Sequence, residues 1–203
     1  MVRIKLPPNE MMMAATIGVC RHIGALKAGR ADAHGMDPGN GWKHHIEGAC
    51  GEIAVAKALK LFWPGTVNTF KDGGDVGKLQ IKPRSKSHYD LIIREDDSDD
   101  AYFVLATGEC PNYEVIGYIR ARDGKRPEWI QTYGDRPAAW FVPQSALIPI
   151  GEMDLIATDD EDMSALISAE HAARYGSAAR RTSVDTQQQT DRVQQSHAPV
   201  QRP

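Results

Sequence analysis

The chain is poor in cysteine and has no long hydrophobic run. Its 203 residues include 3 Cys, which are scattered and form no Cys-x-x-Cys pair. This argues against a disulfide framework and against a zinc site. No apolar stretch approaches the roughly 20 residues that cross a bilayer. We therefore expect a cytoplasmic protein that has free thiols and no membrane partner.

The length and composition predict one domain followed by a tail. The hydrophobic fraction is 41% and the aromatic fraction 7%, both ordinary for a globular chain. Residues 1–175 are long enough to bury a substantial core. From residue 176 to 203, Ser, Gln, Thr and Arg dominate and no apolar periodicity survives. We predict that this tail is disordered.

The net charge of −3 hides an uneven distribution along the chain. Residues 1–88 hold 13 Lys and Arg against 7 Asp and Glu, a net charge of +6. Residues 89–175 hold 7 against 18, a net charge of −11, and residues 176–203 carry +2. The basic part is the one suited to binding phosphate groups.

A Gly-rich turn in this basic part leads into a short strand. The run Asp72-Gly73-Gly74-Asp75-Val76-Gly77-Lys78 is followed by Leu79-Gln80-Ile81-Lys82. Side chains alternate along a strand, so Gln80 and Lys82 share one face. The pattern predicts that a carboxylate, an amide oxygen and an ammonium group converge. Such a set suits a divalent cation and a phosphodiester.

A helix predicted from residue 41 to 62 contributes a further carboxylate. Glu52 lies at helical spacing from Gly48, Val55 and Leu59, on a small and largely apolar face. A carboxylate there needs a partner, and a metal ion is one candidate. Glu47 is the alternative helix carboxylate. For either glutamate, the alternative to binding a metal ion is an ion pair with a lysine at the protein surface.

These residues resemble the core of the PD-(D/E)XK nuclease superfamily, which has a restriction-endonuclease-like fold. The resemblance covers roughly residues 41 to 122 and uses Glu52, Asp75 and the tripeptide Gln80-Ile81-Lys82 in the family's order. The sequence departs from the family pattern at two positions. Gly74 stands where a proline usually precedes the acid, and Gln80 replaces the second acid, as in Mrr-type restriction enzymes.

The resemblance implies a deoxyribonuclease that depends on Mg²⁺, for which Mn²⁺ is a possible substitute. Glu52, Asp75 and Gln80 would be the metal ligands, and Lys82 would assist attack by water. DNA is the expected partner, a homodimer is compatible with this interpretation, and the small chain suits a phage or mobile element. The expected nucleic-acid contacts are Lys78, Arg84, Ser85, Lys86, His88, Arg120 and Arg122. The alternative is a weak or inactive nucleic-acid-binding or assembly protein on the same fold.

The order of the predicted elements favours an α/β (α+β) core with a central mixed sheet flanked by helices. Predicted helices cover residues 9–27, 41–62 and 163–175, and predicted strands cover 66–70, 79–82, 89–94, 101–107 and 114–121. We expect strands 89–94 and 101–107 to form a hairpin across an exposed acidic turn, residues 95–100. We also expect Pro83 to weaken strand pairing, because proline has no N–H to donate.

Overall fold

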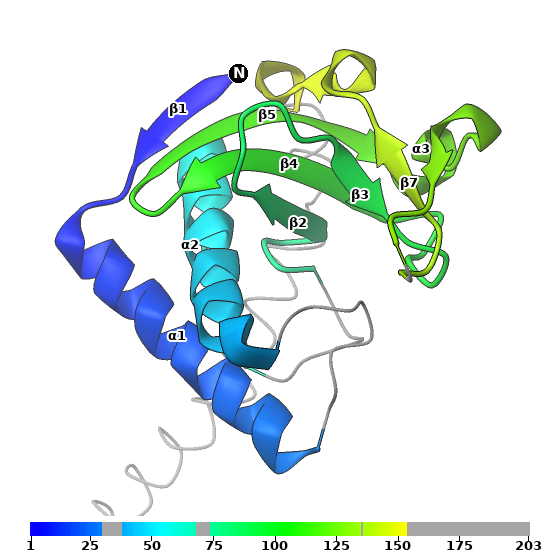
Figure 1. Cartoon of the computed structure of the whole chain (residues 1–203). Helices are drawn as coiled ribbons and strands as arrows, with labels where there is room; N and C mark the ends of the chain where they lie inside the picture. The colour runs from blue at the N-terminus through cyan, green and yellow to red at the C-terminus, as the bar shows by residue number, and fades with distance from the viewer. Residues whose placement is uncertain (30–37, 68–73, 135, 154–203) are drawn as a thin grey trace, which may run out of the picture. The chain divides into compact units, whose positions relative to one another are not determined.

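The computed structural model describes residues 1–29, 38–67, 74–134 and 136–153 (Figure 1). The helices are α1 (Pro8–Lys27), α2 (Gly41–Leu59) and the short α3 (Ala121–Gly124). The strands are β1 (Val2–Lys5), β2 (Leu79–Arg84), β3 (Leu91–Ile93), β4 (Tyr102–Glu109), β5 (Asn112–Arg120), β6 (Ile130–Gln131), β7 (Ala139–Val142) and β8 (Ile148–Pro149). Single turns of 3₁₀ helix cover Pro38–Asn40, Pro127–Trp129, Gln144–Ala146 and Ile150–Glu152.

The strands of the described residues form two sheets. The larger has the order β1-β5-β4-β2, and β8 also pairs with β5. Strand β2 runs parallel to β4, whereas β1, β4 and β8 each run antiparallel to β5. The smaller sheet has the order β3-β7-β6 and is antiparallel. The prediction of a mixed sheet flanked by helices is therefore confirmed.

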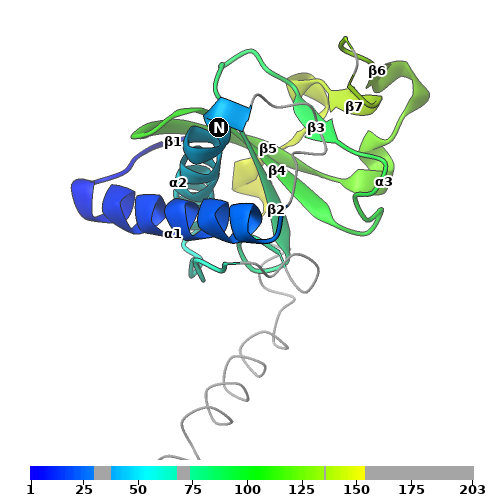
Figure 2. The ribbon, with the colours of Figure 1, turned by 60° about the horizontal axis from the view of Figure 1, so that its bottom comes forward.

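Helix α2 lies between α1 and one face of the larger sheet (Figures 1 and 2). This sandwiched position explains why every residue from Ala49 to Ala56 is buried. Gly51 permits the close approach of β2, because a Cβ atom at this position would lie 2.4 Å from Cγ of Pro83. Close packing does not explain the glycine at position 48, since a Cβ atom there would meet nothing within 4 Å. Small residues thus let the middle of α2 pack directly on the strand that carries the motif.

The opposite face of the larger sheet is covered by the smaller sheet. Leu91, Ile93 and Val142 of the smaller sheet pack against Phe103, Leu105 and Ile119 in one apolar cluster. A second cluster joins α1, α2 and the β4–β5 turn. Trp129 and Trp140 are partly buried and pack against the first cluster. Strand β2 is the edge of the larger sheet, between the α2 layer and the smaller sheet.

The predicted hairpin of residues 89–94 with 101–107 is wrong. Strand β3 pairs with β7, while β4 pairs with β2 on one side and β5 on the other. A pattern of alternating apolar residues predicts a strand but does not determine which strand it pairs with. Consecutive strands usually pair with each other, and this general preference does not hold for β3 and β4. The true hairpin is β4–β5, whose strands are joined by a tight turn at Cys110-Pro111.

The expected weakening of pairing at Pro83 is also wrong, because β2 continues to Arg84 and Pro83 lies opposite Ala106. The N–H of Ile81 points away from β4, where it meets the side chain of Asp75. Pro83 is two residues further on, so its nitrogen faces the same open edge. The missing N–H therefore removes no hydrogen bond from the ladder.

The remaining element predictions are confirmed in part. Helix α2 ends at Leu59, three residues before the predicted end, where Lys60 adopts a left-handed conformation. In the predicted strand 66–70, residues 66 and 67 have no regular structure, and 68–70 lie outside the described residues. The predicted helix 163–175 and the tail 176–203 lie outside them as well. No helix in the described part of the chain is long and apolar enough to span a membrane.

Candidate active site at the edge of strand β2

A tight turn brings Asp75 alongside the free edge of β2. The backbone N–H of Asp75 donates to the carbonyl of Leu79 at 2.8 Å, so the chain folds back on itself between these residues. Two glycines permit the turn. Gly77 has a φ of +57°, and a Cβ on Gly74 would lie 2.5 Å from the backbone of Lys78. The carboxylate Oδ2 of Asp75 then accepts the N–H of Ile81 at 2.7 Å.

Glu52 reaches the same edge from α2, and both its oxygens are engaged. Its residue surface is only 5% exposed. Nη1 and Nη2 of Arg21, from α1, donate to Oε1 and Oε2 at 2.5 and 2.9 Å, and Nε1 of Trp63 donates to Oε2 at 2.9 Å. Arg21 is itself fixed, since its Nε donates to the carbonyl of Thr66 at 2.8 Å. The partner that the sequence required for Glu52 is therefore an arginine.

The electrostatics of Asp75 involve two other residues predicted for the site, Glu52 and Lys82. Burial raises the pKa of Asp75 to about 6, and the nearby charge of Glu52 adds to this rise. The N–H of Ile81 and the cations Lys82 and Arg21 act in the opposite direction and lower the pKa. Glu52 and Lys82 thus each lie within electrostatic range of Asp75.

Lys82 lies on the face of β2 that is turned away from α2, where two contacts hold its side chain in place. Its Nζ lies 3.5 Å from Oδ1 of Asp97 and 4.9 Å from the centre of the Phe103 ring. Asp97 is anchored in turn, because its Oδ2 accepts the backbone N–H of Arg94 at 2.8 Å. Gln80 is half-buried and, by the alternation of the strand, lies on the same face as Lys82.

Glu47, the alternative helix carboxylate, lies in a different environment. Its Oε2 accepts the hydroxyl of Tyr113 at 2.6 Å and the backbone N–H of Cys110 at 3.1 Å. These contacts tie α2 to the β4–β5 turn. The geometry therefore places Glu52, and not Glu47, beside Asp75.

The acidic segment Glu95–Asp100, hereafter the acidic loop, binds basic residues that the sequence suggested for nucleic acid. Asp100 forms ion pairs with both Arg120 and Arg122. Asp99 pairs with Lys125 at 2.7 Å, and Nζ of Lys125 also donates to the carbonyl of Asp97. The segment expected to be an exposed hairpin turn is thus a loop whose carboxylates form ion pairs with nearby cations. The charges of Arg120 and Arg122 are therefore already offset within the protein.

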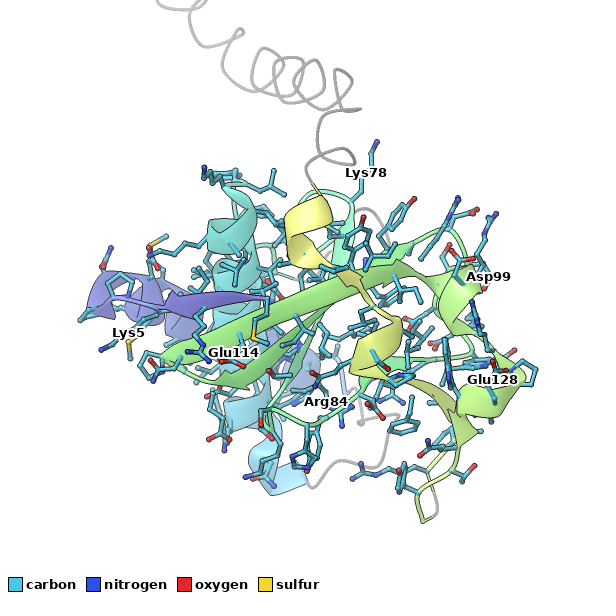
Figure 3. All side chains as sticks on the ribbon, turned by 90° about the horizontal axis from the view of Figure 1, so that it is seen from above. Lys5, Lys78, Arg84, Asp99, Glu114 and Glu128 are labelled. Atoms are coloured by element: carbon cyan, nitrogen blue, oxygen red, sulfur yellow. The ribbon has the colours of Figure 1, made fainter. Side chains whose placement is uncertain are left out.

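The other predicted nucleic-acid contacts surround the end of β2 or the turn before it. Lys78 is exposed and its side chain projects away from the ribbon (Figure 3). Ser85, Lys86 and His88 are exposed in the loop after β2. Arg84 is half-buried, with its guanidinium carbon 4.8 Å from the centre of the Tyr89 ring. Arg84 lies opposite Thr107, whereas Arg120 lies opposite Tyr102 at the other end of β4. The structure therefore separates Arg84 from the pair Arg120 and Arg122, whereas Lys78 adjoins Leu79, the partner of Tyr102.

Three residues of the site escaped the sequence reasoning, namely Arg21, Trp63 and Asp97. A signal for Arg21 was present, because it adjoins the buried positions Ala14, Gly18 and His22 on α1. An arginine beside a buried helical stripe needs an anionic partner. Asp97 carried no such signal, because the acidic run around it predicts an exposed turn. Trp63 lies between the predicted helix 41–62 and the predicted strand 66–70, where no motif singles it out.

The strand edge does not contain a ready-made metal cluster. Among the described residues, no group of three or more His, Cys, Asp or Glu side chains is arranged to hold a metal ion. An open groove of about 300 Å³ lies elsewhere, and its lining includes Arg3, Ser87, Thr107 and Asn112. Comparisons of the chain with protein-family models, with curated proteins and with solved structures each found no match.

Proposed function

We propose that this protein is a metal-dependent nuclease with a restriction-endonuclease-like core, which hydrolyses DNA phosphodiester bonds. The observation that supports this most strongly is that Asp75 caps the free edge of β2 with both Glu52 and Lys82 within its electrostatic range. Two carboxylates and an ammonium group around an open strand edge can bind a cation and a phosphate together.

The residues at this edge suit a hard divalent cation such as Mg²⁺, with Mn²⁺ as a substitute. Arg21 offsets the charge of Glu52, and Asp97 lies beside Lys82, so Asp75 keeps the least compensated negative charge. Its repulsion with Glu52 is one that a divalent cation would relieve. Asp75 and Gln80 would hold the cation through oxygen atoms. Glu52 would add Oε1, which accepts one hydrogen bond and has a second lone pair.

Each residue then has a chemical role. A bound divalent cation would lower the pKa of a coordinated water and offset charge on the phosphate. Lys82 would orient the attacking water or stabilise the phosphate oxygens as their charge increases. Asp97 and the Phe103 ring would restrain Lys82, so that its ammonium group points toward the strand edge. Arg21 and Trp63 would keep Glu52 in a single orientation.

The direct test is incubation of the purified protein with supercoiled and linear DNA, with EDTA, Mg²⁺ or Mn²⁺. We expect nicking or degradation that requires the metal and disappears in Asp75→Asn. A matched control is Glu47→Gln, because Glu47 lies in the β4–β5 turn environment and not beside Asp75. Metal-independent cleavage, or equal activity in Asp75→Asn, would overturn the proposal.

A second candidate is a nucleic-acid-binding or assembly protein without catalysis. Two observations favour it: Gln80 provides no negative charge, and both oxygens of Glu52 already accept hydrogen bonds from Arg21. Binding of DNA in EDTA together with stable DNA in Mg²⁺ and Mn²⁺ would select this candidate.

A further inference from the structure

The acidic loop divides the cations near the site into two groups. Lys82, Arg120, Arg122 and Lys125 each have a carboxylate of this loop as an ion-pair partner. A polyanion at Arg120 or Arg122 would have to displace Asp100. Cations that are available to bind phosphate should therefore lie on the side of Lys82 that faces away from the acidic loop.

Arg84 is the clearest of these. It lies two residues after Lys82, on the same face of β2, so their Cα atoms are about 6.6 Å apart. Arg84 forms no ion pair within the described residues, and its buried Nη1 has no hydrogen-bond partner. Burial is the largest influence on its pKa and lowers it. A half-buried guanidinium group without a direct ion-pair partner is costly, and a bound phosphate would reduce that cost.

A second arginine and two tyrosine rings adjoin Arg84. Arg94 is near enough to repel it and has no ion-pair partner in the described part of the chain. Tyr89 stacks on the Arg84 guanidinium group, and Tyr133 lies within electrostatic range of Arg84. One carboxylate, Asp90, also lies close to Arg84 and partly offsets this positive charge.

The smaller sheet provides the base on which these groups lie. Phe141 of β7 is paired with Ile92 of β3, and alternation along β3 predicts that Arg94 shares the face of Ile92. The Tyr133 ring packs edge-on against Phe141, with centroids 4.9 Å apart, and Tyr133 is 57% exposed. The Tyr133 hydroxyl also donates to Oε1 of Gln131 at 2.5 Å. A ring that is held in this way and is open to solvent is well placed to stack on a flat partner.

We propose that this surface, the arginine–tyrosine face, binds a DNA strand with unpaired bases. It consists of Arg84, Tyr89, Arg94, Tyr133 and Phe141. The two arginines would contact successive phosphates and Tyr133 would stack on a base, a combination typical of single-strand binding. Figure 3 shows Arg84 well apart from Asp99 of the acidic loop, so the strand would leave Lys82 on the side away from that loop. Only this last point, the direction relative to Lys82, rests on the proposed nuclease function.

The test measures binding separately from cleavage. Fluorescence anisotropy in EDTA would compare a labelled single-stranded oligonucleotide of about 20 nucleotides with its duplex, over a series of salt concentrations. The variants are Arg94→Ala and Tyr133→Ala. The matched control is Arg122→Ala, which removes an arginine that already has a carboxylate partner. Circular dichroism would verify that each variant is folded.

We expect Arg94→Ala to weaken single-strand binding about tenfold and to reduce the slope of log K against log salt by about 0.7, the value for one phosphate contact on a single strand. Tyr133→Ala should weaken binding by a similar factor with an unchanged slope, because stacking involves no counterion release. Arg122→Ala should stay within about twofold of the parent, since a neutralised arginine contributes little to counterion release.

Three results would overturn the inference: no binding by the parent protein, tighter binding of duplex than of single strand, or equal losses in Arg122→Ala and Arg94→Ala. Failure of the nuclease proposal would look different. In that case the parent and its variants would show the expected binding pattern in EDTA, while DNA remained intact in Mg²⁺ and Mn²⁺.

Discussion

Arg21 and Glu52 form a two-pronged ion pair, with Nη1–Oε1 and Nη2–Oε2 distances of 2.5 and 2.9 Å, that joins α1 to α2 beside Asp75. The side chains are 16% and 7% exposed, so the pair is largely shielded from water. Breaking one partner of a buried pair leaves an uncompensated charge, which typically costs about 3–5 kcal/mol. The pair therefore matters for the fold as well as for the site.

The first prediction concerns this pair. Arg21→Met should lower the melting temperature by several degrees, because Glu52 would stay buried without its guanidinium partner. Adding Glu52→Gln should recover part of the loss, since the amide carries no charge to compensate. Thermal denaturation of the parent, the two single variants and the double variant gives the coupling free energy between Arg21 and Glu52. Additive effects in that cycle would mean that the pair contributes nothing specific to stability.

The second prediction follows from the raised pKa of Asp75, about 6 in the folded protein against 3.8 ordinarily. The folded state binds this proton more tightly than the unfolded state does. The protein should therefore lose stability as pH rises from about 4 to about 6, and the loss should level off above that range. After allowance for screening of a partly exposed group, the effect is about 1–3 kcal/mol.

Asp75→Asn should remove this dependence, because an amide does not titrate and its oxygen can still accept the N–H of Ile81. Urea denaturation at a series of pH values without divalent metal measures the difference between the two proteins. Their stability curves should diverge between pH 4 and 6, with the variant more stable at the upper end. Parallel curves would show that Asp75 has an ordinary pKa.

Much of this arrangement could be predicted from local patterns, and the rest depends on contacts between distant segments. The helical periodicity of α1 and α2 and the strand at Leu79–Lys82 are visible in the sequence and present in the structure. The glycines on both sides of Asp75 likewise indicate a backbone that can fold back on β2. These features depend on neighbours within a few residues.

The partners of Glu52 and Lys82 could not be found in this way. Arg21 is 31 residues from Glu52, and Asp97 is separated from Lys82 by the whole of β3. The strand pairing was mispredicted for the same reason, since β3 finds its partner in β7, almost 50 residues later. The sequence of the acidic loop predicts only an exposed turn, because nothing in the neighbouring residues shows which cations surround it.

The third prediction tests the role of Lys82. Lys82→Ala should abolish metal-dependent DNA cleavage and leave the fold intact, because the side chain is 28% exposed and lies outside the apolar clusters. Lys82→Arg should restore little activity, since a planar guanidinium group does not replace a compact ammonium charge. The measurement is the initial cleavage rate, with circular dichroism as a check on folding. A well-folded Lys82→Ala protein that cleaves at the parent rate would refute the assignment.

The last prediction concerns Gln80 as a weak metal ligand. Gln80 stands two residues before Lys82 on the same strand face, half-buried, on the strand whose edge Asp75 caps. Its amide oxygen can coordinate a hard cation but lacks the charge of a carboxylate, so the native site should need a relatively high Mg²⁺ concentration. Gln80→Glu is nearly isosteric and adds one negative charge. It should therefore lower the Mg²⁺ concentration that gives half-maximal cleavage.

The measurement is the cleavage rate against Mg²⁺ concentration for the parent, Gln80→Glu and Asp75→Asn. Mg²⁺ titrations of thermal stability provide a readout that does not require activity, because a ligand that binds only the folded state raises its melting temperature. Asp75→Asn should lose both cleavage and the metal-induced stabilisation. If Gln80→Glu leaves both titrations unchanged while Asp75→Asn abolishes them, then Gln80 is not a ligand and the cation depends on the two carboxylates alone. If neither variant alters cleavage or metal-induced stabilisation, the binding-protein alternative replaces the nuclease proposal.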